Sequence, residues 1–388
     1  MTEAGPPPIG VYVHWPYCAR ICPYCDFNVV RDRGRRAEQA ALVAAILADL
    51  RAQAAMAGPR RLLSIFFGGG TPSLMTPDAV TAIIEEARRL FIPADDLEVS
   101  LEANPTDAEA GKFADLAGAG VNRLSLGVQS LDDAALKFLG RNHDVAQAKR
   151  AIKAGRASFA RLSIDLIYAL PIQTPAAWAA ELAAAADMGA EHVAPYQLTI
   201  EAGTPFDRAV RREAWSPPDD DLGAALYETT QDVLGAAGFT AYEVSNHARG
   251  LAAQSRHNLI YWRGQDYLGV GPGSHGRLTD GEGRRWASEA AAGVGDYAAR
   301  VSGTGVGFVT RERLSARDVA LERLLMGLRT VEGVALAELE PLGIAEATLH
   351  GMSEAGLIDF NGDRIVVSLV GRAVLDRITF DLAASGAK

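Results

Sequence analysis

Two hydrophobic periodicities alternate over the first two thirds of the chain. Short runs of β-branched and other apolar residues predict buried strands at 11–17, 62–68, 97–103, 122–128, 161–168 and 193–200. Alanine-rich stretches between them carry apolar residues at helical spacing and predict helices at 37–56, 78–91, 108–119, 144–157, 175–187 and 219–237. This repetition of strand and helix predicts an α/β fold with a mostly parallel sheet.

Six strand and helix units are too few to close an eight-stranded barrel. Right-handed crossovers and sheet twist still bend such units into an arc, so the pattern predicts an open, partial (β/α)6 barrel of the TIM type. We expect its functional face at the carboxyl ends of the strands, where parallel sheets hold their ligands. The lateral opening would admit a large substrate.

The remaining pattern divides the chain into further parts. Residues 1–9 are expected to form a flexible N-terminus, and residues 10–248 the partial barrel. Residues 249–309 are rich in glycine and predict an irregular extension on the substrate side, dominated by loops. Residues 310–388 predict a C-terminal domain, with helices at 310–330, 336–342 and 346–355 and a hairpin at 359–368 that turns at Asn361-Gly362. Helices followed by a small hairpin resemble a winged-helix module.

Composition narrows the class of protein. Hydrophobic residues make up 48% of the 388 residues and charged residues 22%, as in ordinary soluble domains. No apolar run is expected to reach the ~20 residues of a membrane-spanning helix. A net charge of −10 argues against a protein that works by neutralising nucleic-acid phosphates. The N-terminal residues lack the basic and apolar segments of a secretion signal, so we expect a cytoplasmic location.

The cysteines carry the strongest chemical signal. All three lie within eight residues, as Cys18, Cys22 and Cys25 in a C-x3-C-x2-C array after the first predicted strand. An odd number at this spacing excludes a disulfide framework and indicates metal ligation. Iron–sulfur clusters normally take four thiolates. Three would leave one iron of a [4Fe–4S] cluster free for an outside chelator, such as S-adenosylmethionine (SAM); a zinc site with a fourth ligand elsewhere is the alternative.

A glycine-rich turn, Gly68-Gly69-Gly70-Thr71-Pro72, follows the second predicted strand. Glycines permit a close backbone approach, and exposed N–H and C=O groups can hold the amino group of a cofactor. By itself such a turn is more often a turn without a ligand. Together with the cysteine array one unit earlier, however, it resembles the radical-SAM superfamily. That resemblance implies a [4Fe–4S] cluster and SAM.

A closer resemblance, to the porphyrin branch of that superfamily, covers nearly the whole chain. The motifs that carry it lie at 12–18, 68–72, 102–105, 123–129, 141 and 165–168. This resemblance implies a SAM pocket lined by Tyr12, Tyr24, Gly69, Gly70, Thr71, Glu102, Gln129, Arg141 and Asp165. Polar residues at strand ends also commonly have solvated or capping roles, which is the alternative for Glu102, Gln129 and Asp165.

Two features separate the kinds of protein within this branch. Phe27 stands where the pattern of the coproporphyrinogen III oxidases has a further cysteine, and the first strand begins near residue ten, without their N-terminal extension. Residues 256–262 resemble a His-Asn-x-x-Tyr-Trp motif of the heme chaperones. In it, His257 is a candidate axial ligand of heme iron, and Tyr261 and Trp262 are candidates for stacking on the macrocycle. A structural histidine with both aromatic rings in the core is the alternative.

We therefore expect a heme chaperone on a radical-SAM scaffold, which binds a [4Fe–4S] cluster, SAM and heme and delivers heme to an acceptor hemoprotein. The expected acceptors include membrane-bound respiratory proteins. The chain itself is expected to be a monomer or homodimer without a transmembrane segment, with peripheral membrane contact left open. Coproporphyrinogen III oxidase activity, which Phe27 disfavours, and a radical-SAM enzyme for an unrelated substrate are the alternatives.

Overall fold

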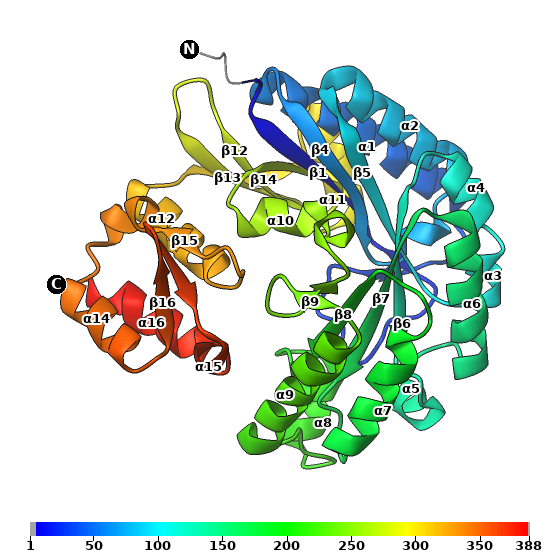
Figure 1. Ribbon diagram of the computed structural model, residues 1–388. Helices are drawn as coiled ribbons and strands as arrows, with labels where there is room; N and C mark the ends of the chain where they lie inside the picture. The colour runs from blue at the N-terminus through cyan, green and yellow to red at the C-terminus, as the bar shows by residue number, and fades with distance from the viewer. Residues whose placement is uncertain (1–4, 387–388) are drawn as a thin grey trace.

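A curved sheet organises residues 5–386, the part of the chain that the computed structural model describes (Figure 1). Its parallel strands are, in spatial order, β11 (Asp266–Val270), β1 (Pro8–Trp15), β4 (Arg61–Gly69), β5 (Ile92–Ala103), β6 (Arg123–Gln129), β7 (Arg161–Tyr168) and β8 (His192–Gln197). Antiparallel strands extend both ends, namely β12 (His275–Thr279), β13 (Arg285–Ala290) and β14 (Phe308–Arg313) beyond β11, and β10 (His247–Ala248) and β9 (Thr240–Ala241) beyond β8. The predicted strands are confirmed as β1 and β4 to β8.

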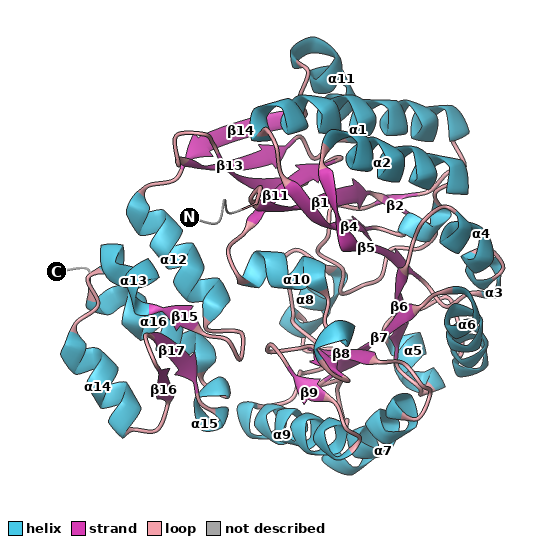
Figure 2. Cartoon of the chain, turned by 45° about the horizontal axis from the view of Figure 1, so that its top comes forward, coloured by secondary structure: helices cyan, strands magenta, loops and turns pink. Residues whose placement is uncertain are grey.

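Helices cover the outer face of the arc (Figures 1 and 2). They are α1 (Arg36–Ala57), α2 (Pro77–Leu90), α4 (Phe113–Gly118), α6 (Val145–Ser158), α7 (Pro175–Ala186) and α9 (Asp220–Ala236). This arrangement confirms the α/β partial barrel. Shorter elements that the pattern did not predict are β2 (Tyr17–Cys18), β3 (Val30–Arg31), α5 (Asp133–Phe138), α8 (Pro205–Arg211) and the 3-10 turns η1 (Pro72–Leu74) and η2 (Leu251–Ala253).

Side-chain caps set where several covering helices begin. The Thr76 hydroxyl accepts a hydrogen bond from the Ala79 N–H, and Pro77 occupies the first turn of α2. Thr174 and Pro175 repeat this arrangement at α7. Proline lacks the N–H that would be unsatisfied in the first turn, so such short local signals are enough to locate a helix start.

The hydrophobic core lies between the sheet and these helices. Strand residues such as Val11 and Leu101 are fully buried in it. Trp178 of α7 stacks on Tyr168 at the end of β7, with 5.3 Å between ring centroids, and its indole N–H donates to Thr230 of α9 (2.8 Å). These contacts fix the end of a strand that borders the functional face.

Helix α1 qualifies the expectation that no apolar run reaches the length of a membrane-crossing helix. Within the described residues, it meets that criterion by length and composition, with a mean hydropathy of 1.5 over its most apolar window. Leu42, Ile46 and Leu50 of α1 are buried in the core of the sheet. A core helix of this kind passes the same test of length and composition.

The segment 249–309 is ordered, which corrects the expectation of a loop-dominated extension. It contains α10 (Arg256–Trp262) and α11 (Val294–Thr304), and its strands complete one side of the sheet. Glycine serves strand packing here, because a Cβ on Gly269 of β11 would lie 2.0 Å from the carbonyl oxygen of His275 on β12. Such short strands form through pairing with their neighbours, so the local pattern does not reveal them.

Two predicted helices are divided differently. Residues 308–313 form β14 of the large sheet, and α12 (Ala316–Gly327) follows a capping box of Ser315 and Asp318. The helix expected at 108–119 is split into α3 (Asp107–Ala110) and α4. At the N-terminus, β1 already begins at Pro8, inside the stretch expected to be flexible, while residues 1–4 lie outside the described residues.

The C-terminal domain has a hydrophobic core of its own, which includes Leu324, Val334, Ile365 and Leu382. After α12, its elements are β15 (Val334–Ala335), α13 (Leu336–Leu339), η3 (Glu340–Leu342), α14 (Glu346–Glu354), β16 (Ile358–Asn361), β17 (Arg364–Val367), α15 (Leu369–Arg372) and α16 (Leu375–Ser385). The hairpin of β16 and β17 turns at Asn361-Gly362, as expected. The domain lies at the open side of the arc (Figures 1 and 2).

A buried hydrogen-bond network that joins α1 to α11 provides a test of this packing. The Tyr297 hydroxyl donates to Asp49 (2.8 Å) and accepts from the Gly271 N–H (2.9 Å). Tyr297→Phe leaves both buried groups without this partner. We expect the free energy of unfolding, measured by urea denaturation, to fall by about 1–3 kcal/mol.

Tyr227→Phe is the matched control. Its buried hydroxyl has no hydrogen-bond partner within residues 5–386, so its removal breaks no hydrogen bond and is not expected to lower the free energy of unfolding. Equal losses in the two variants would contradict the role given to Tyr297.

Candidate functional site

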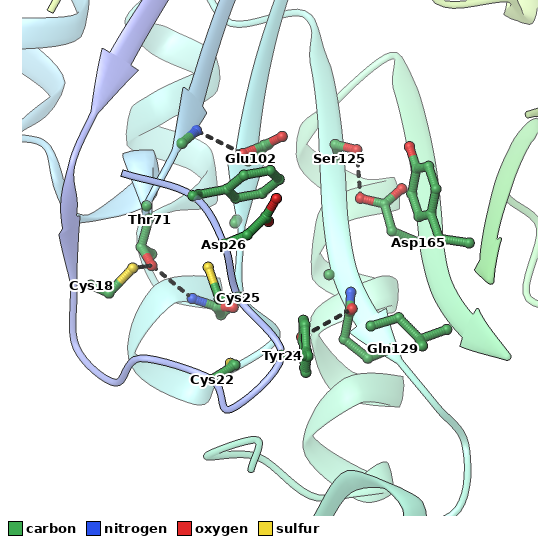
Figure 3. A pocket seen from close by; sticks show the side chains of 18 of the residues that line it. Cys18, Cys22, Tyr24, Cys25, Asp26, Thr71, Glu102, Ser125, Gln129 and Asp165 are labelled. Carbon is green, nitrogen blue, oxygen red and sulfur yellow. Dashed lines mark hydrogen bonds between the residues drawn. The ribbon is translucent and has the colours of Figure 1, made fainter. Parts of the chain in front are cut away.

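A cavity of about 430 Å³ opens at the carboxyl ends of the parallel strands. The loop that follows β1 carries the cysteines and forms one side of it. Figure 3 shows Cys18, Cys22 and Cys25 on that side, with Ser125 and Asp165 on strands across the cavity. The functional face thus lies where the strand and helix pattern predicts it.

The three thiols are free, and each lines this cavity. Thr71 donates a hydrogen bond to the sulfur of Cys18 (3.6 Å), and the Cys25 N–H donates to the Cys22 carbonyl (3.2 Å), which closes the loop into a turn. Burial raises the pKa of the Cys18 thiol and raises that of Cys25 to about 11. A nearby metal cation is the kind of partner that lowers such a pKa and yields the thiolate.

The number and placement of the thiols fit an iron–sulfur cluster, because all three lie on one loop at the cavity. Zinc requires its ligands to converge at about 2.0–2.3 Å, whereas a cluster takes one thiolate at each iron and accepts separated sulfurs. Cys18, Cys22 and Cys25 would therefore hold a [4Fe–4S] cluster. The sequence offers no fourth cysteine for the remaining iron.

The glycine-rich turn owes its composition to close packing. Gly69 has φ +106°, and a Cβ there would lie 2.5 Å from the His14 ring. The Gly69 N–H donates to Glu102 (3.2 Å), and the Gly70 N–H donates to the carbonyl of Trp15 (2.7 Å). Both glycines line the cavity as predicted, but these N–H groups are bonded within the protein rather than exposed for a cofactor.

Two carboxyl groups line the cavity from β5 and β7, the strands on either side of β6. Burial, and then the charge of Asp165, raises the pKa of Glu102 to about 8. Burial also raises the pKa of Asp165, which accepts hydrogen bonds from Ser125 (2.8 Å) and Ser163 (2.9 Å). A protonated Glu102 can donate a hydrogen bond near neutral pH, and the remaining carboxylate oxygens can accept from ribose hydroxyls or an amino group.

Gln129, Tyr24 and Arg141 form a polar cluster at the cysteine side. Gln129 has φ +68° at an irregularity in the pairing of β6 with β7, and its side chain accepts from the Tyr24 hydroxyl (3.3 Å). Arg141 donates to the sulfur of Cys22 (3.3 Å) and to the Gly127 carbonyl (3.0 Å). Its Nε–H is buried without a partner among the described residues, which leaves a donor for a ligand carboxylate.

Further residues line the cavity that the sequence analysis did not single out. They include Asn104, Arg123, Ser125, Ser163, His192, Tyr196, Asn246 and Asn258. Arg123 and Ser125 share one face of β6 because they alternate with buried leucines. This alternation within the motif 123–129 is the signal that could have identified them.

Tyr12 and His257 do not line this cavity. Tyr12 hydrogen bonds to His14 (3.0 Å) and borders a smaller, neighbouring cavity. His257 is buried, with its ring nitrogens hydrogen bonded to Ser64 (2.7 Å) and Tyr261 (2.7 Å), and burial lowers its pKa to about 3. Both ring nitrogens of His257 are thus occupied within the protein, because α10 packs the imidazole against β4. The contacts expected of Tyr12 with SAM and of His257 with heme iron stay predictions.

Tyr261 and Trp262 line a second cavity of about 910 Å³, together with residues of the C-terminal domain. The residues common to both cavities are Phe27, Tyr196, Asn246 and Asn258. The two cavities are therefore neighbours, separated by single side chains. The structure places Tyr261 and Trp262 at one cavity, and His257 is not among the residues that line it. The stacking of both rings on heme stays a prediction.

Comparison with known proteins agrees with this geometry. Residues 12–184 match the Radical SAM superfamily, and residues 314–374 match the HemN C-terminal domain. The second match begins directly after β14, where the large sheet ends.

Curated relatives cover nearly the whole chain. It is 39% identical over 386 residues to the mitochondrial radical S-adenosyl methionine domain-containing protein 1 of Bos taurus, across 96% of this chain and 86% of that protein. It is 36% identical over 375 residues to the heme chaperone HemW of Mycobacterium tuberculosis, across 96% and 94%. Coproporphyrinogen III oxidase (HemN) from Escherichia coli has the same fold, with a TM-score of 0.79 over 98% of this chain and 91% of that one, at 21% identity.

The raised pKa of Glu102 predicts a pH dependence for the protein without bound cofactors. Between about pH 4.5 and 8 the folded state retains a proton that the unfolded chain has released, so the free energy of unfolding falls as the pH rises through this window. Glu102→Gln removes this titration. We expect the variant to lose less stability than the original protein between about pH 6 and 8.5, as measured by urea denaturation.

Glu86→Gln serves as the control. In the original protein, hydrogen bonds with Arg89 hold the pKa of Glu86 at about 2, so Glu86 titrates below the pH range of this test. A Glu102→Gln variant whose stability changes with pH as the original protein's does would show that Glu102 is ionised in the folded state.

Proposed function

Because the chain belongs to the radical SAM superfamily, in the porphyrin branch that includes HemN and the heme chaperone HemW, we propose that it is a heme chaperone. In this proposal it binds heme together with a [4Fe–4S] cluster and SAM, and delivers the heme to an acceptor hemoprotein. The proposal extends to a cytoplasmic location, to a membrane-bound respiratory protein as the class of acceptor, and to a monomer or homodimer.

The observation that carries the proposal is the pairing of two cavities. Tyr261 and Trp262 come from the segment that resembles the heme chaperone motif, and both line the cavity of about 910 Å³. That volume lies within the range of about 300–1,000 Å³ typical of ligand and cofactor sites. His257 supports this wall as a positioning residue, since its hydrogen bond holds the Tyr261 hydroxyl.

The first cavity suits the cluster and SAM. When bound, they supply a source of electrons and a sulfonium whose carbon–sulfur bond can be cleaved. Glu102 and Asp165 offer hydrogen bonds to hydroxyl or amino groups, and the free Nε–H of Arg141 offers one to a carboxylate. Gln129 is held toward Tyr24 by its left-handed backbone conformation.

Coproporphyrinogen III oxidase is the second candidate. The fold shared with HemN and the match to its C-terminal domain favour it. Phe27 argues against it, because this residue, 60% exposed, lines both cavities at the position where the oxidase pattern has a further cysteine. The chain has no thiol for that position.

A pair of assays on anaerobically reconstituted protein separates these functions. We expect one equivalent of heme to saturate the protein in a Soret-band titration, and no protoporphyrinogen to form from coproporphyrinogen III with SAM and a reductant. The reason is that the large aromatic cavity is present while the additional thiol is not. Formation of protoporphyrinogen would establish the oxidase, and failure to bind heme would end the chaperone proposal.

The cysteines give a further prediction. Replacement of Cys18, Cys22 or Cys25 by alanine is expected to reduce iron and sulfide content sharply, because two thiolates cannot anchor the cluster. Asp26→Asn, on the same loop, is the control and should retain both. Heme binding should persist in all of these variants, since the second cavity contains no cysteine. Unchanged iron and sulfide in any cysteine variant, or zinc in anaerobically isolated protein, would refute the cluster assignment.

A further inference from the structure

The second cavity lies where the barrel and the C-terminal domain meet. Its walls come from α10, β11, β12 and β13 on the barrel side and from α12 on the other. Aromatic side chains contribute much of the surface, namely Phe27, Tyr196, Tyr261, Trp262 and Tyr267. Tyr261 and Tyr267 meet edge to face, with 4.6 Å between ring centroids. Rings of this kind provide large, rigid contact surfaces for a flat apolar ligand.

Cationic side chains surround these rings. Within residues 5–386, the cavity is lined by five arginines and three glutamates, an excess of positive charge in a chain with a net charge of −10. The arginines are Arg263, Arg277, Arg285, Arg323 and Arg329. Burial raises the pKa of Glu243, one of the three glutamates, to about 7, which increases the excess. Three of the arginines pair with carboxylates that lie outside the lining, namely Glu332, Asp266 and Asp376, so an anionic ligand binds here where it can displace a carboxylate partner.

Some of these arginines are fixed by the protein itself. Arg323 is held between Glu338 (2.7 Å) and the Trp262 carbonyl (2.8 Å). Arg285 pairs with Asp266 (3.0 Å), whose side chain is buried. The side chains of Arg323 and Arg285 are themselves only 10% and 13% exposed, so these two arginines serve the packing of the domains.

Arg277 and Arg329 can each exchange a carboxylate partner of the protein for a carboxylate of the ligand. Arg277 pairs with Glu322 (2.8 Å), and Arg329 pairs with Asp376 (2.8 Å). The carboxylate partners keep 29% and 88% of their side-chain surface exposed to water. The ion pair of Arg329 with the exposed Asp376 is therefore weak. Arg277 holds Glu322 through both its Nε (2.9 Å) and an Nη (2.8 Å), so a ligand carboxylate there has to displace Glu322. Guanidinium groups bind carboxylates in a bidentate manner with good geometry.

Two buried polar atoms of the lining lack partners. The indole N–H of Trp262 and the side-chain oxygen of Asn246 have no hydrogen-bond partner among the described residues. Asn246 is 97% buried and borders both cavities, where its amide nitrogen bonds to Glu243. Buried polar groups of folded proteins are normally satisfied, so unpartnered ones at a cavity indicate a place for a polar ligand group or water.

We propose that this cavity is the heme site, with the macrocycle against Tyr261 and Trp262 and the two propionates on Arg277 and Arg329. This assignment rests on the proposed heme chaperone function and adds the site and the chemistry of recognition. Heme combines a large apolar plane with two carboxylates at one edge, which matches an aromatic wall bordered by exchangeable arginines. The shared lining residues, among them Phe27 and Asn246, place the bound heme beside the cavity of the thiols.

The test compares heme with its dimethyl ester, which retains the plane but lacks the carboxylates. Full-length protein is titrated with each, and the Soret absorbance gives the dissociation constant. We expect heme to bind at least about tenfold more tightly than the ester, and Arg277→Gln and Arg329→Gln each to weaken heme binding by about tenfold with little change for the ester. Arg377→Gln, an exposed arginine paired with Asp381 outside the cavity, is the matched control.

Glu322→Gln tests the same site through an expected gain in heme affinity instead of a loss. It removes the carboxylate that competes for Arg277, so heme binding should tighten while ester binding stays the same. A gain in affinity cannot arise from a misfolded variant.

The outcomes separate the site from the function. If the protein binds no heme, the chaperone proposal fails. If it binds one heme, but heme and ester bind alike and all arginine variants match Arg377→Gln, the function stands and this site is wrong. Weakening by Arg277→Gln or Arg329→Gln together with tightening by Glu322→Gln supports the site.

Discussion

The functional face depends on a contact between two backbone segments, the end of β1 and the glycine-rich turn after β4. The Gly70 N–H donates to the Trp15 carbonyl (2.7 Å), and the Thr71 N–H donates to the Tyr17 carbonyl (2.9 Å). A Cβ on Gly70 would lie 2.8 Å from the Trp15 oxygen, so a larger residue cannot make this approach without displacement. The contact places the Thr71 hydroxyl on the Cys18 sulfur. The cysteine array and the glycine motif are therefore held against each other by these hydrogen bonds.

The two cavities differ in electrostatics, and the difference matches the ligands proposed for them. The first combines raised-pKa carboxyl groups, Glu102 and Asp165, with the guanidinium of Arg141, a set suited to a small cofactor with hydroxyl, amino and carboxylate groups. The second joins aromatic rings to five arginines, a set suited to a flat dicarboxylate. Asn246 borders both, so the two ligands would be separated by a single layer of side chains.

The His257 motif shows how one set of residues supports two readings until burial is known. An imidazole followed four residues later by a tyrosine is compatible with metal ligation and stacking. In the structure that spacing places both side chains on one face of α10, and the imidazole bridges Ser64 and the Tyr261 hydroxyl. The histidine acts through Tyr261, which reaches the cavity, while its own ring stacks near Phe66 (4.9 Å between centroids).

The sequence by itself determined the α/β partial barrel, the C-terminal domain and the C-x3-C-x2-C thiol set, because helical and strand periodicities and short spacings are local properties. Caps such as Thr76 and Thr174 made helix starts readable for the same reason. Only the tertiary structure decided that residues 266–290 complete the sheet, that His257 is enclosed, and that Arg277 and Arg329 meet at one cavity. Each of these depends on contacts between segments far apart in the chain, and such contacts leave no period or spacing in the residues that make them.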